Sequence, residues 1–463
     1  MDYGKKMKSP ALCASSLIVS LGLCLSAAAP PKSPNPQIQS ILSQISTDRI
    51  AEIQQKLESF GTRNIYSAND DPNHGIGAAR QWIAGQFKSF SPKLQVSFDK
   101  HGLVGSPEKR LFRNVEIWNV VAVLPGTSEP ERRVMVSGHY DSLDMVYKTG
   151  PDGKRVLDSE ATIAAVAPGV TDDGSGTAAV MELARVMSQY QFRKTIVFVA
   201  FAAEEYGLFG SGLYAQEAVA KHEIIDGLFN NDIIGSDVTG NGETSNRYVN
   251  VYSAGPEDSV SRSLARYMRD MNERYQPGFD VNLVFRHDRF RRGGDHSPFE
   301  AAGFPAIRIT TPMENFSNQH TATDTFQNTA PSYTTLVVKA NAAGIASLAL
   351  APKAPELPTT GPSAPELPAP SPLGRGKGYD AVMNWKDDKP EPDLLGYAVV
   401  MRKTTSPLWE KEIFVGKTLT YTLPNVNIDE VVLGVKAIDQ DGNESPVVAY
   451  VAPPYRQPKI PTY

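Results

Sequence analysis

The spacing of apolar residues predicts alternating helices and strands along most of the chain. In the region 37–90, Ile38, Ile41, Leu42 and Ile45 stand three and four positions apart, as on one face of a helix. Farther on, β-branched apolar runs predict strands at 119–124, 134–136, 195–202 and 306–309, and helical spacing predicts helices near 177–187 and 260–275. Because these strands are apolar on both faces, we expect an α/β fold with a mostly parallel central sheet flanked by helices. Ligands of such sheets bind beyond the carboxyl ends of the strands.

A proline-rich segment, residues 351–378, separates this region from a shorter one with a different pattern. It contains the sequence APELP twice, from Ala354 and from Ala364, which indicates a stiff, extended linker. Short alternating strands separated by turn residues follow at 381–385, 396–402, 412–415, 418–423 and 431–438. That pattern predicts a small all-β sandwich. We therefore expect two domains, at 34–350 and 379–453.

The first 29 residues have the pattern of a secretory signal peptide. Lys5, Lys6 and Lys8 precede an apolar stretch at 11–25, and small residues at 26–29 suit cleavage. The apolar stretch is shorter than the roughly 20 residues of a membrane-spanning helix, so no stable membrane insertion is expected after cleavage. The sequence thus predicts a secreted or periplasmic protein.

Cysteine content and charge argue against disulfides, a lipid anchor and a nucleic-acid partner. Both cysteines, Cys13 and Cys24, lie in the predicted signal, so a cleaved chain would contain no disulfide. Leu23 stands before Cys24 where a lipoprotein signal has a small residue, which argues against lipid anchoring. Forty-six basic and 51 acidic residues give a formal charge of −5 without a basic block, so nucleic acid is not expected as a partner.

Five short motifs place metal-ligating or acidic side chains near the ends of predicted strands. They are, in order, His139 and Asp141 in SGHYDS, Asp172 in TDDGSG, Glu204 and Glu205 in FAAEEYG, Asp232 in NNDIIG and His320 in NQHTATDT. The adjacent carboxylates Glu204 and Glu205 would repel each other at a strand end unless positive charge lay nearby, and a metal ion would supply it. Each motif alone also fits a structural role. Together they form a set of oxygen and nitrogen ligands suited to zinc.

The order of the motifs resembles that of peptidase family M28, from about residue 50 to residue 350. The resemblance implies a zinc exopeptidase-like fold and most often an aminopeptidase that acts on peptides with a free amino terminus. It also implies roles for individual residues. His139 and Asp232 would bind one zinc ion, Glu205 and His320 a second, and Asp172 would bridge the two. Glu204 would be the general base, and Asp141 would orient His139.

Two other functions stay open at this point. Glutaminyl cyclases resemble the same family, retain most of these residues and use one zinc ion to cyclise an amino-terminal glutamine. A non-catalytic binding protein on the same fold is the other, although no ligand position is missing here. In the second region, Trp385, the Gly396-Tyr397 pair and VKAIDQDGNES resemble a fibronectin type III domain.

Several segments have no assigned chemistry. The segment 145–170 is longer than in many members of the family and would form either a rim over the substrate pocket or a solvent loop. Gln319 and Ala322 depart from the YHTP that often surrounds the last histidine, which puts the shape of that loop in doubt. His296, in RRGGDHSPFE, is expected to be structural or to shape the pocket. The remaining histidines are expected to be surface or structural residues: His74, His101, His222 and His287.

Overall fold

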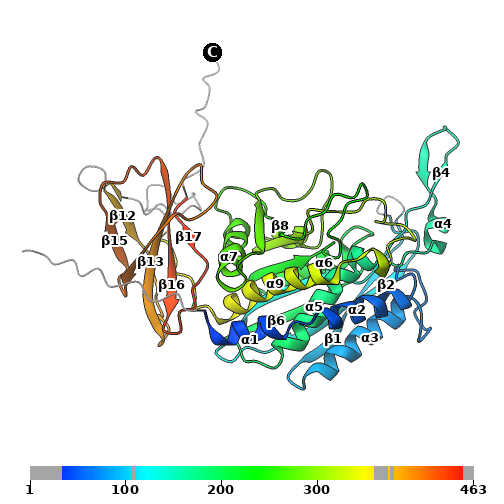
Figure 1. Ribbon diagram of the computed structural model, residues 1–463, viewed down its shortest axis with the longest axis horizontal. Coiled ribbons are helices and arrows are strands. Elements are labelled where there is room, and N and C mark those ends of the chain that lie inside the picture. Colours follow the sequence, from blue (N-terminus) through cyan, green and yellow to red (C-terminus); the bar gives the residue numbers. More distant parts are fainter. Residues whose placement is uncertain (1–33, 107–109, 359–373, 376–379, 452–463) are drawn as a thin grey trace, which may run out of the picture.

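A mixed β-sheet forms the centre of the larger part of the molecule (Figure 1). The computed structural model describes residues 34–106, 110–358, 374–375 and 380–451, so the predicted signal peptide, with Cys13 and Cys24, lies outside the described residues. The strands of the sheet are β1 (Gln95–Leu103), β2 (Val115–Leu124), β3 (Glu129–His139), β6 (Lys194–Phe201), β7 (Ile224–Asn231), β8 (Tyr248–Tyr252), β9 (Asp280–Val284) and β10 (Ala306–Thr310). Their spatial order is β1-β2-β6-β3-β7-β10-β8-β9.

The centre of this sheet is parallel and its edges are mixed. Strands β6, β3, β7 and β10 run parallel to one another. By contrast, β1, β2 and β6 pair antiparallel, as do β10 and β8. The α/β fold is therefore confirmed; the expected parallel arrangement holds for the centre and for the edge pair of β8 and β9, and the other pairs are antiparallel. Every residue of β6 is buried, and its continuous apolar sequence predicts it as a strand. The edge strand β1 has no buried residue, and its sequence does not predict it.

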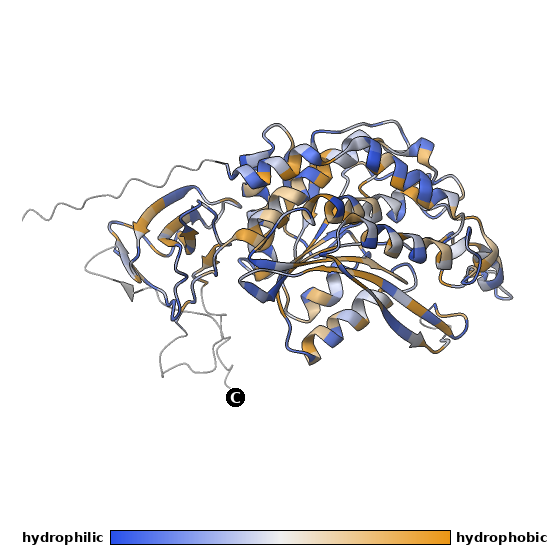
Figure 2. Ribbon diagram, turned by 90° about the horizontal axis from the view of Figure 1, so that it is seen from below, coloured by the Kyte–Doolittle hydropathy of each residue, from blue (hydrophilic) through white to orange (hydrophobic). Residues whose placement is uncertain are grey.

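Helices cover both faces of the sheet (Figure 2). One face carries α1 (Pro36–Gln44), α2 (Thr47–Ser59), α3 (Gly75–Phe90), α5 (Ser175–Met187), α7 (Val260–Tyr275) and α9 (Pro331–Leu350), which share the larger hydrophobic core. The other face carries α6 (Phe209–Ala220) and α8 (His296–Ala301), which pack in a smaller core. Side-chain caps begin several of these helices; Ser46 accepts from the backbone N–H of Arg49 at the start of α2.

One helix of the described residues, α9, is long and apolar enough to cross a membrane by length and composition. However, 83% of its apolar window is buried inside the fold, where it packs against α7, α2 and β3. Its apolar composition is accounted for by this burial, because a helix that is hydrophobic all round suits the interior of a large domain.

The segment after β3 stands out from the body of the molecule. It forms a two-stranded hairpin, β4 (Tyr147–Thr149) and β5 (Arg155–Leu157), followed by the short helix α4 (Ser159–Ala164). Figure 1 shows the hairpin projecting away from the central sheet. Most of this segment is therefore an arm exposed to solvent, which is one of the two alternatives expected for residues 145–170.

The shorter region is a separate antiparallel β structure. One sheet contains β11 (Gly374–Arg375), β12 (Ala381–Asn384) and β15 (Thr420–Leu423), and the other contains β14 (Lys411–Gly416), β13 (Leu394–Lys403), β16 (Val431–Asp439) and β17 (Val448–Ala449). Trp385 and Tyr397 lie in the core between them, with ring centroids 5.6 Å apart. The small all-β sandwich is thus confirmed. Its resemblance to a fibronectin type III domain stays a prediction.

The start of the proline-rich segment packs against this sandwich. Glu356 forms a β-bridge with Lys386, and Leu357 contacts the sandwich core. The first APELP sequence therefore belongs to packed structure, whereas the second lies outside the described residues.

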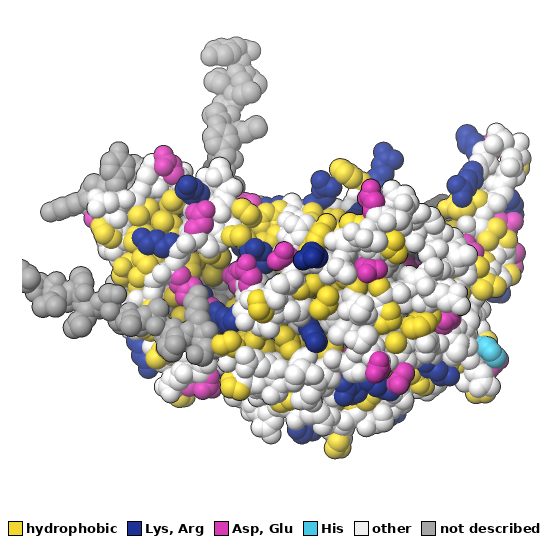
Figure 3. Space-filling model, in the orientation of Figure 1, with side chains coloured by type: hydrophobic (Ala, Val, Ile, Leu, Met, Phe, Trp, Pro, Cys, Tyr) yellow, Lys and Arg dark blue, Asp and Glu magenta, His cyan; other side chains and the backbone are white. Residues whose placement is uncertain are grey.

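The two parts of the molecule are joined by charged contacts centred on α7. Arg402, on β13, is fully buried and donates to Asp258 at 2.8 Å and to Glu257 at 2.9 Å, just before α7 begins. Arg266 on α7 donates to the carbonyl oxygen of Pro407 at 2.7 Å, and Arg274 pairs with Glu444 at 2.7 Å. Figure 3 shows acidic and basic side chains gathered at this junction. The sandwich is therefore docked on the larger part through α7 and also through Arg193, which pairs with Glu391 and Asp393.

Candidate metal centre

The predicted ligands converge at the carboxyl ends of the parallel strands. His139 is the last residue of β3, and Asp232 directly follows β7. Glu204 and Glu205 lie just beyond β6, and His320 lies on the loop after β10. Asp172 sits in the turn Val170–Gly174, immediately before α5. This edge of an open sheet is where the topology of α/β proteins places ligand sites.

Asp172 lies between the two histidines. Its Oδ1 is 3.3 Å from Nε2 of His139, and its Oδ2 is 3.2 Å from Nε2 of His320. On the first side, Oδ1 of Asp232 lies 3.9 Å from Nε2 of His139. On the second, Oε2 of Glu205 lies 3.0 Å from Nε2 of His320. The five candidate ligands therefore form two groups that share Asp172.

These separations suit zinc coordination. Tetrahedral ligands about 2.0–2.1 Å from a zinc ion lie about 3.4 Å from one another. In addition, Nε2 of His139 and Oε1 of Glu205 are buried and have no hydrogen-bond partner among the described residues. Buried polar atoms are normally satisfied, so two such atoms in one cluster of candidate ligands fit a metal site.

The electrostatics of the cluster also favour a bound cation. Burial, followed by the neighbouring Asp232 and Glu205 carboxylates, raises the pKa of Glu204 well above its usual range. The Glu205 carboxylate, together with Asp172, raises the pKa of His320 to about 12. The neighbouring carboxylates contribute to both shifts, so the cluster holds an excess of negative charge. A divalent cation would neutralise that charge.

Asp141 supports the centre, though not as expected. Nδ1 of His139 lies 3.1 Å from the backbone carbonyl oxygen of Asp141 and 3.6 Å from its carboxylate Oδ1. The carbonyl is thus the acceptor that orients the imidazole. The carboxylate instead accepts from the backbone N–H groups of Glu204 and Glu205, at 3.2 and 3.4 Å. Asp141 therefore fixes the loop that carries the two glutamates.

Asp173 holds the ligand-bearing loops together, a role that the sequence did not indicate. Its carboxylate accepts from the backbone N–H groups of His139 at 3.0 Å, Gly176 at 2.8 Å and Ile233 at 3.2 Å. Gly176 permits this approach, since a Cβ there would lie 2.3 Å from Oδ2 of Asp173. The glycine of the DDGSG motif was the signal for this close packing.

Two further residues that the sequence did not indicate, Asp324 and Arg308, hold candidate ligands in place. Asp324, inside the HTATDT motif, accepts from the backbone N–H groups of Thr171 at 2.9 Å and Asp172 at 3.0 Å. Arg308 on β10 is buried and lies 2.7 Å from Oδ2 of Asp232, so that the other oxygen of Asp232 faces His139. A charged residue within an otherwise apolar, buried strand was the signal that could have identified Arg308.

The backbone is left-handed at several positions next to the ligands. The φ angles are +63° at Ala203, +59° at Ile233 and +54° at His320. Non-glycine residues adopt such angles at a cost of about 1–3 kcal/mol, and they concentrate at functional sites. The contacts of Asp141 and Asp173 supply the support that these conformations require.

A cavity of 660 Å³ opens directly over the cluster. It is lined by Asp172, Glu204, Glu205, Asp232 and His320, together with residues of several loops and Arg308 of β10. Met145 is the one residue of segment 145–170 among these lining residues, so the projecting arm does not form a rim over the cavity.

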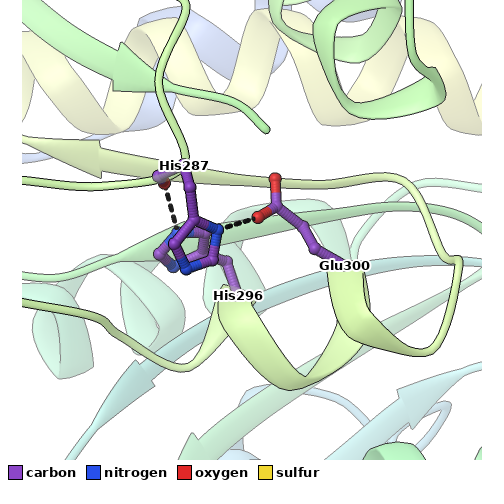
Figure 4. Close-up of side chains that lie close together, drawn as sticks. All are labelled: His287, His296 and Glu300. Carbon is purple, nitrogen blue, oxygen red and sulfur yellow. Dashed lines mark hydrogen bonds and ion pairs between the residues drawn. The ribbon is translucent and has the colours of Figure 1, made fainter. Parts of the chain in front are cut away.

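A second group of possible ligands has a simpler explanation. His296 and Glu300, both on α8, lie close to His287 of the preceding loop (Figure 4). Nδ1 of His287 is 2.6 Å from Glu300, and Nε2 of His296 is 3.0 Å from the backbone carbonyl oxygen of His287. His296 is fully buried, and burial lowers its pKa to about 3. His296 is therefore neutral near pH 7, and its contacts are those of a structural histidine, one of the two roles expected from the sequence.

Comparison with known proteins agrees with the geometry. A model of peptidase family M28 matches residues 119–345. A probable zinc metalloprotease of Leptosphaeria maculans is 34% identical over 444 residues, covering 90% of this chain and 97% of the relative. One of Pyricularia oryzae is 34% identical over 449 residues, covering 89% and 84%.

Solved structures share the fold. LapB from Legionella pneumophila matches with a TM-score of 0.52 at 22% identity, over 69% of this chain and 76% of that chain. The LapA aminopeptidase of the same organism matches with a TM-score of 0.50 at 19% identity, over 68% and 75%. The motifs, the convergence of the ligands and the relatives, which are named as probable zinc metalloproteases, lead to one conclusion: the chain belongs to peptidase family M28.

Proposed function

We propose that this protein is an exported aminopeptidase that uses two zinc ions to remove amino-terminal residues from peptides. The observation that carries the proposal is the position of Asp172, with one oxygen facing His139 and the other facing His320. A carboxylate held in this way can ligate two ions at once. His139 and Asp232 would complete one ion's ligands, and Glu205 and His320 those of the other.

Zinc ions in these positions would lower the pKa of a shared water molecule and polarise the scissile carbonyl group. Glu204 would act as the general base, since its carboxylate lies 4.0 Å from Nε2 of His139 and lines the cavity. It would accept the proton of the attacking water and deliver it to the leaving amine. The contacts of Asp141 with the Glu204 and Glu205 backbone would hold this carboxylate in place.

Several features support an exopeptidase. The free α-amino group of a peptide would lie beside the carboxylates of the cavity and the metal ions, which would place the first peptide bond at the metal centre. The LapA structure, which shares the fold, is that of an aminopeptidase. The lysine-rich start and apolar stretch of the first 29 residues support export.

A substrate screen tests the proposal. Peptides with free or acetylated amino termini, with free or amidated carboxyl termini, and with amino-terminal glutamine are incubated with and without a chelator. Metal content is measured on the same samples. We expect chelator-sensitive release of the first residue from unblocked peptides and two zinc ions per chain. Cleavage that tolerates an acetylated terminus would contradict the aminopeptidase assignment, and cyclisation of glutamine with one zinc ion would indicate a cyclase.

A further inference from the structure

Arginine side chains line the cavity above the metal centre. They are Arg110, Arg289, Arg291, Arg292 and Arg308. The acidic residues that line the same cavity are the candidate ligands and the candidate base. Since zinc ions would neutralise the ligands, the remaining charge of the lining comes from the arginines that have no carboxylate of their own. A concave site lined by one sign of charge concentrates ligands of the opposite sign.

The structure separates the arginines that are neutralised from those that are not. Arg308 pairs with Asp232, and Arg289 pairs with Asp288 at 2.9 Å. Arg289 and Arg292 also share one carboxylate, that of Glu314. Among the described residues, Arg291 has no carboxylate within 4.0 Å. The charge of Arg291 is therefore not compensated by a carboxylate. The charge of Arg292 is compensated only in part, because Glu314 also pairs with Arg289.

The loop that carries these two arginines is fixed next to the metal centre. The carbonyl oxygen of Gly293 accepts from Nη1 of Arg308 at 2.8 Å, and Arg308 itself holds Asp232. On the opposite side, Gln319, the residue before His320, donates to Glu314 at 3.1 Å. Both contacts join the arginine loop to candidate ligands, so a substrate at the metal centre lies within reach of its guanidinium groups.

We propose, on the basis of the aminopeptidase function, that Arg291 and Arg292 bind a carboxylate of the substrate peptide close to the scissile bond. Carboxylates are the anionic groups that peptides carry, and guanidinium groups bind them through paired, charge-assisted hydrogen bonds. The carboxylate comes either from the side chain of an acidic first residue or from the carboxyl terminus of a dipeptide. Paired hydrogen bonds from the two guanidinium groups would make the enzyme prefer peptides that carry a carboxylate at this position.

Two matched pairs of substrates distinguish these sources. The first pair is Glu-Leu-amide and Gln-Leu-amide, and the second is Leu-Leu and Leu-Leu-amide. We expect the carboxylate-bearing member of one pair to have a kcat/KM about ten- to a hundredfold higher, as for hydrogen bonds to charged groups. The pair that shows this preference identifies the source of the carboxylate.

Variants connect the preference to the two arginines. R291M and R292M remove each charge, and the double variant removes both. R286M is the control, because Arg286 is exposed on the same loop, contacts the Phe290 ring and does not line the cavity. We expect the preference to fall to about twofold or less in the double variant and to persist in R286M. Equal kcat/KM within both pairs, or a preference that survives in the double variant, would overturn the proposal.

Binding measurements separate the test of the carboxylate site from the test of the aminopeptidase function. The same four peptides are titrated calorimetrically into the zinc-loaded E204Q chain, where turnover is not required. Chelator-sensitive cleavage without any preference would leave the aminopeptidase function intact and reject the carboxylate site. Absence of cleavage would reject the function, while tighter binding of a carboxylate-bearing peptide, lost in the double variant, would still support the site. Equal binding of all four peptides would reject it.

Discussion

The buried Arg402 guanidinium provides a direct test of how the sandwich is attached to the larger part. Arg402 is fully buried, and Asp258, its partner at 2.8 Å, is 3% exposed. Replacing Arg402 with methionine keeps most of the side-chain volume and removes the charge. Asp258 would then retain only Arg266, at 3.0 Å. We expect the chain to lose stability and the sandwich to unfold separately.

The size of the effect follows from burial. Removing one partner of a buried ion pair costs about 3–5 kcal/mol, because the other charge stays buried. Since Asp258 keeps a second arginine, we expect a loss of about 2 kcal/mol for R402M. D258N removes the opposite charge, and asparagine tolerates the φ of +61° at this position. A double-mutant cycle with R402M and D258N should give a coupling energy of about 1–2 kcal/mol.

Urea unfolding monitored by tryptophan fluorescence measures these values. Trp385 and Trp409 report on the sandwich, whereas Trp82 and Trp118 report on the larger part. The parent chain should unfold in one transition, and R402M should show an earlier transition of the sandwich. A coupling energy below about 0.5 kcal/mol would refute the reasoning, because contacting charges that stabilise the junction cannot be additive.

Three further predictions concern the metal centre and its surroundings. E204Q should keep its zinc and lose most turnover, since the proton acceptor is gone while the ligands remain; parent-like activity would contradict the assigned base. H320A should lose about one zinc ion per chain by metal analysis, because His320 belongs to one of two ligand groups; unchanged zinc content would show that the loop does not carry a ligand. His296, whose pKa burial lowers to about 3, binds a proton in the unfolded chain below about pH 6.5 but not in the folded chain. Its contribution to stability is therefore complete above pH 6.5 and falls as the pH drops, by about 2 kcal/mol between pH 7 and pH 5. The pH dependence of unfolding should be weaker by this amount in H296Q, and identical slopes in the two chains would exclude a neutral buried histidine.

The sequence predicted the centre of the fold better than its edges. Strands β6 and β10 are buried on both faces, so their composition alone distinguishes them from loops. Strands β1 and β9 lie at the edges, where solvent reaches part of each strand and the apolar pattern weakens. The central strand β7 was also missed, although its position carries Asp232. Apolar composition therefore identifies strands such as β6 and β10, but it misses a buried strand of mixed composition such as β7 and does not define where the sheet ends.

The candidate ligands were predictable because they stand in short motifs that follow one another in a characteristic order. The residues that support them were not predictable in this way. Asp173 acts through backbone N–H groups of residues 34 to 60 positions away in sequence. Such contacts leave no periodic trace, since any residue can supply a backbone donor. The arginines of the loop before α8 were equally hidden, because only the fold brings that loop to the same cavity as β10.

The positions of these supporting residues also explain how the loops of the site are held in place although its carboxylates repel one another. Asp172, Glu204, Glu205 and Asp232 are carboxylates brought together in a buried place, which opposes folding unless cations are bound. Their loops are therefore attached by contacts that do not depend on metal. Asp173 joins β3 to the turn after β7, and Asp324 fixes the backbone of Asp172. Because Asp173 and Asp324 accept hydrogen bonds from backbone N–H groups, the ligand oxygens remain free to bind metal. The same contacts fix the loops and so keep the distances between the ligands nearly constant.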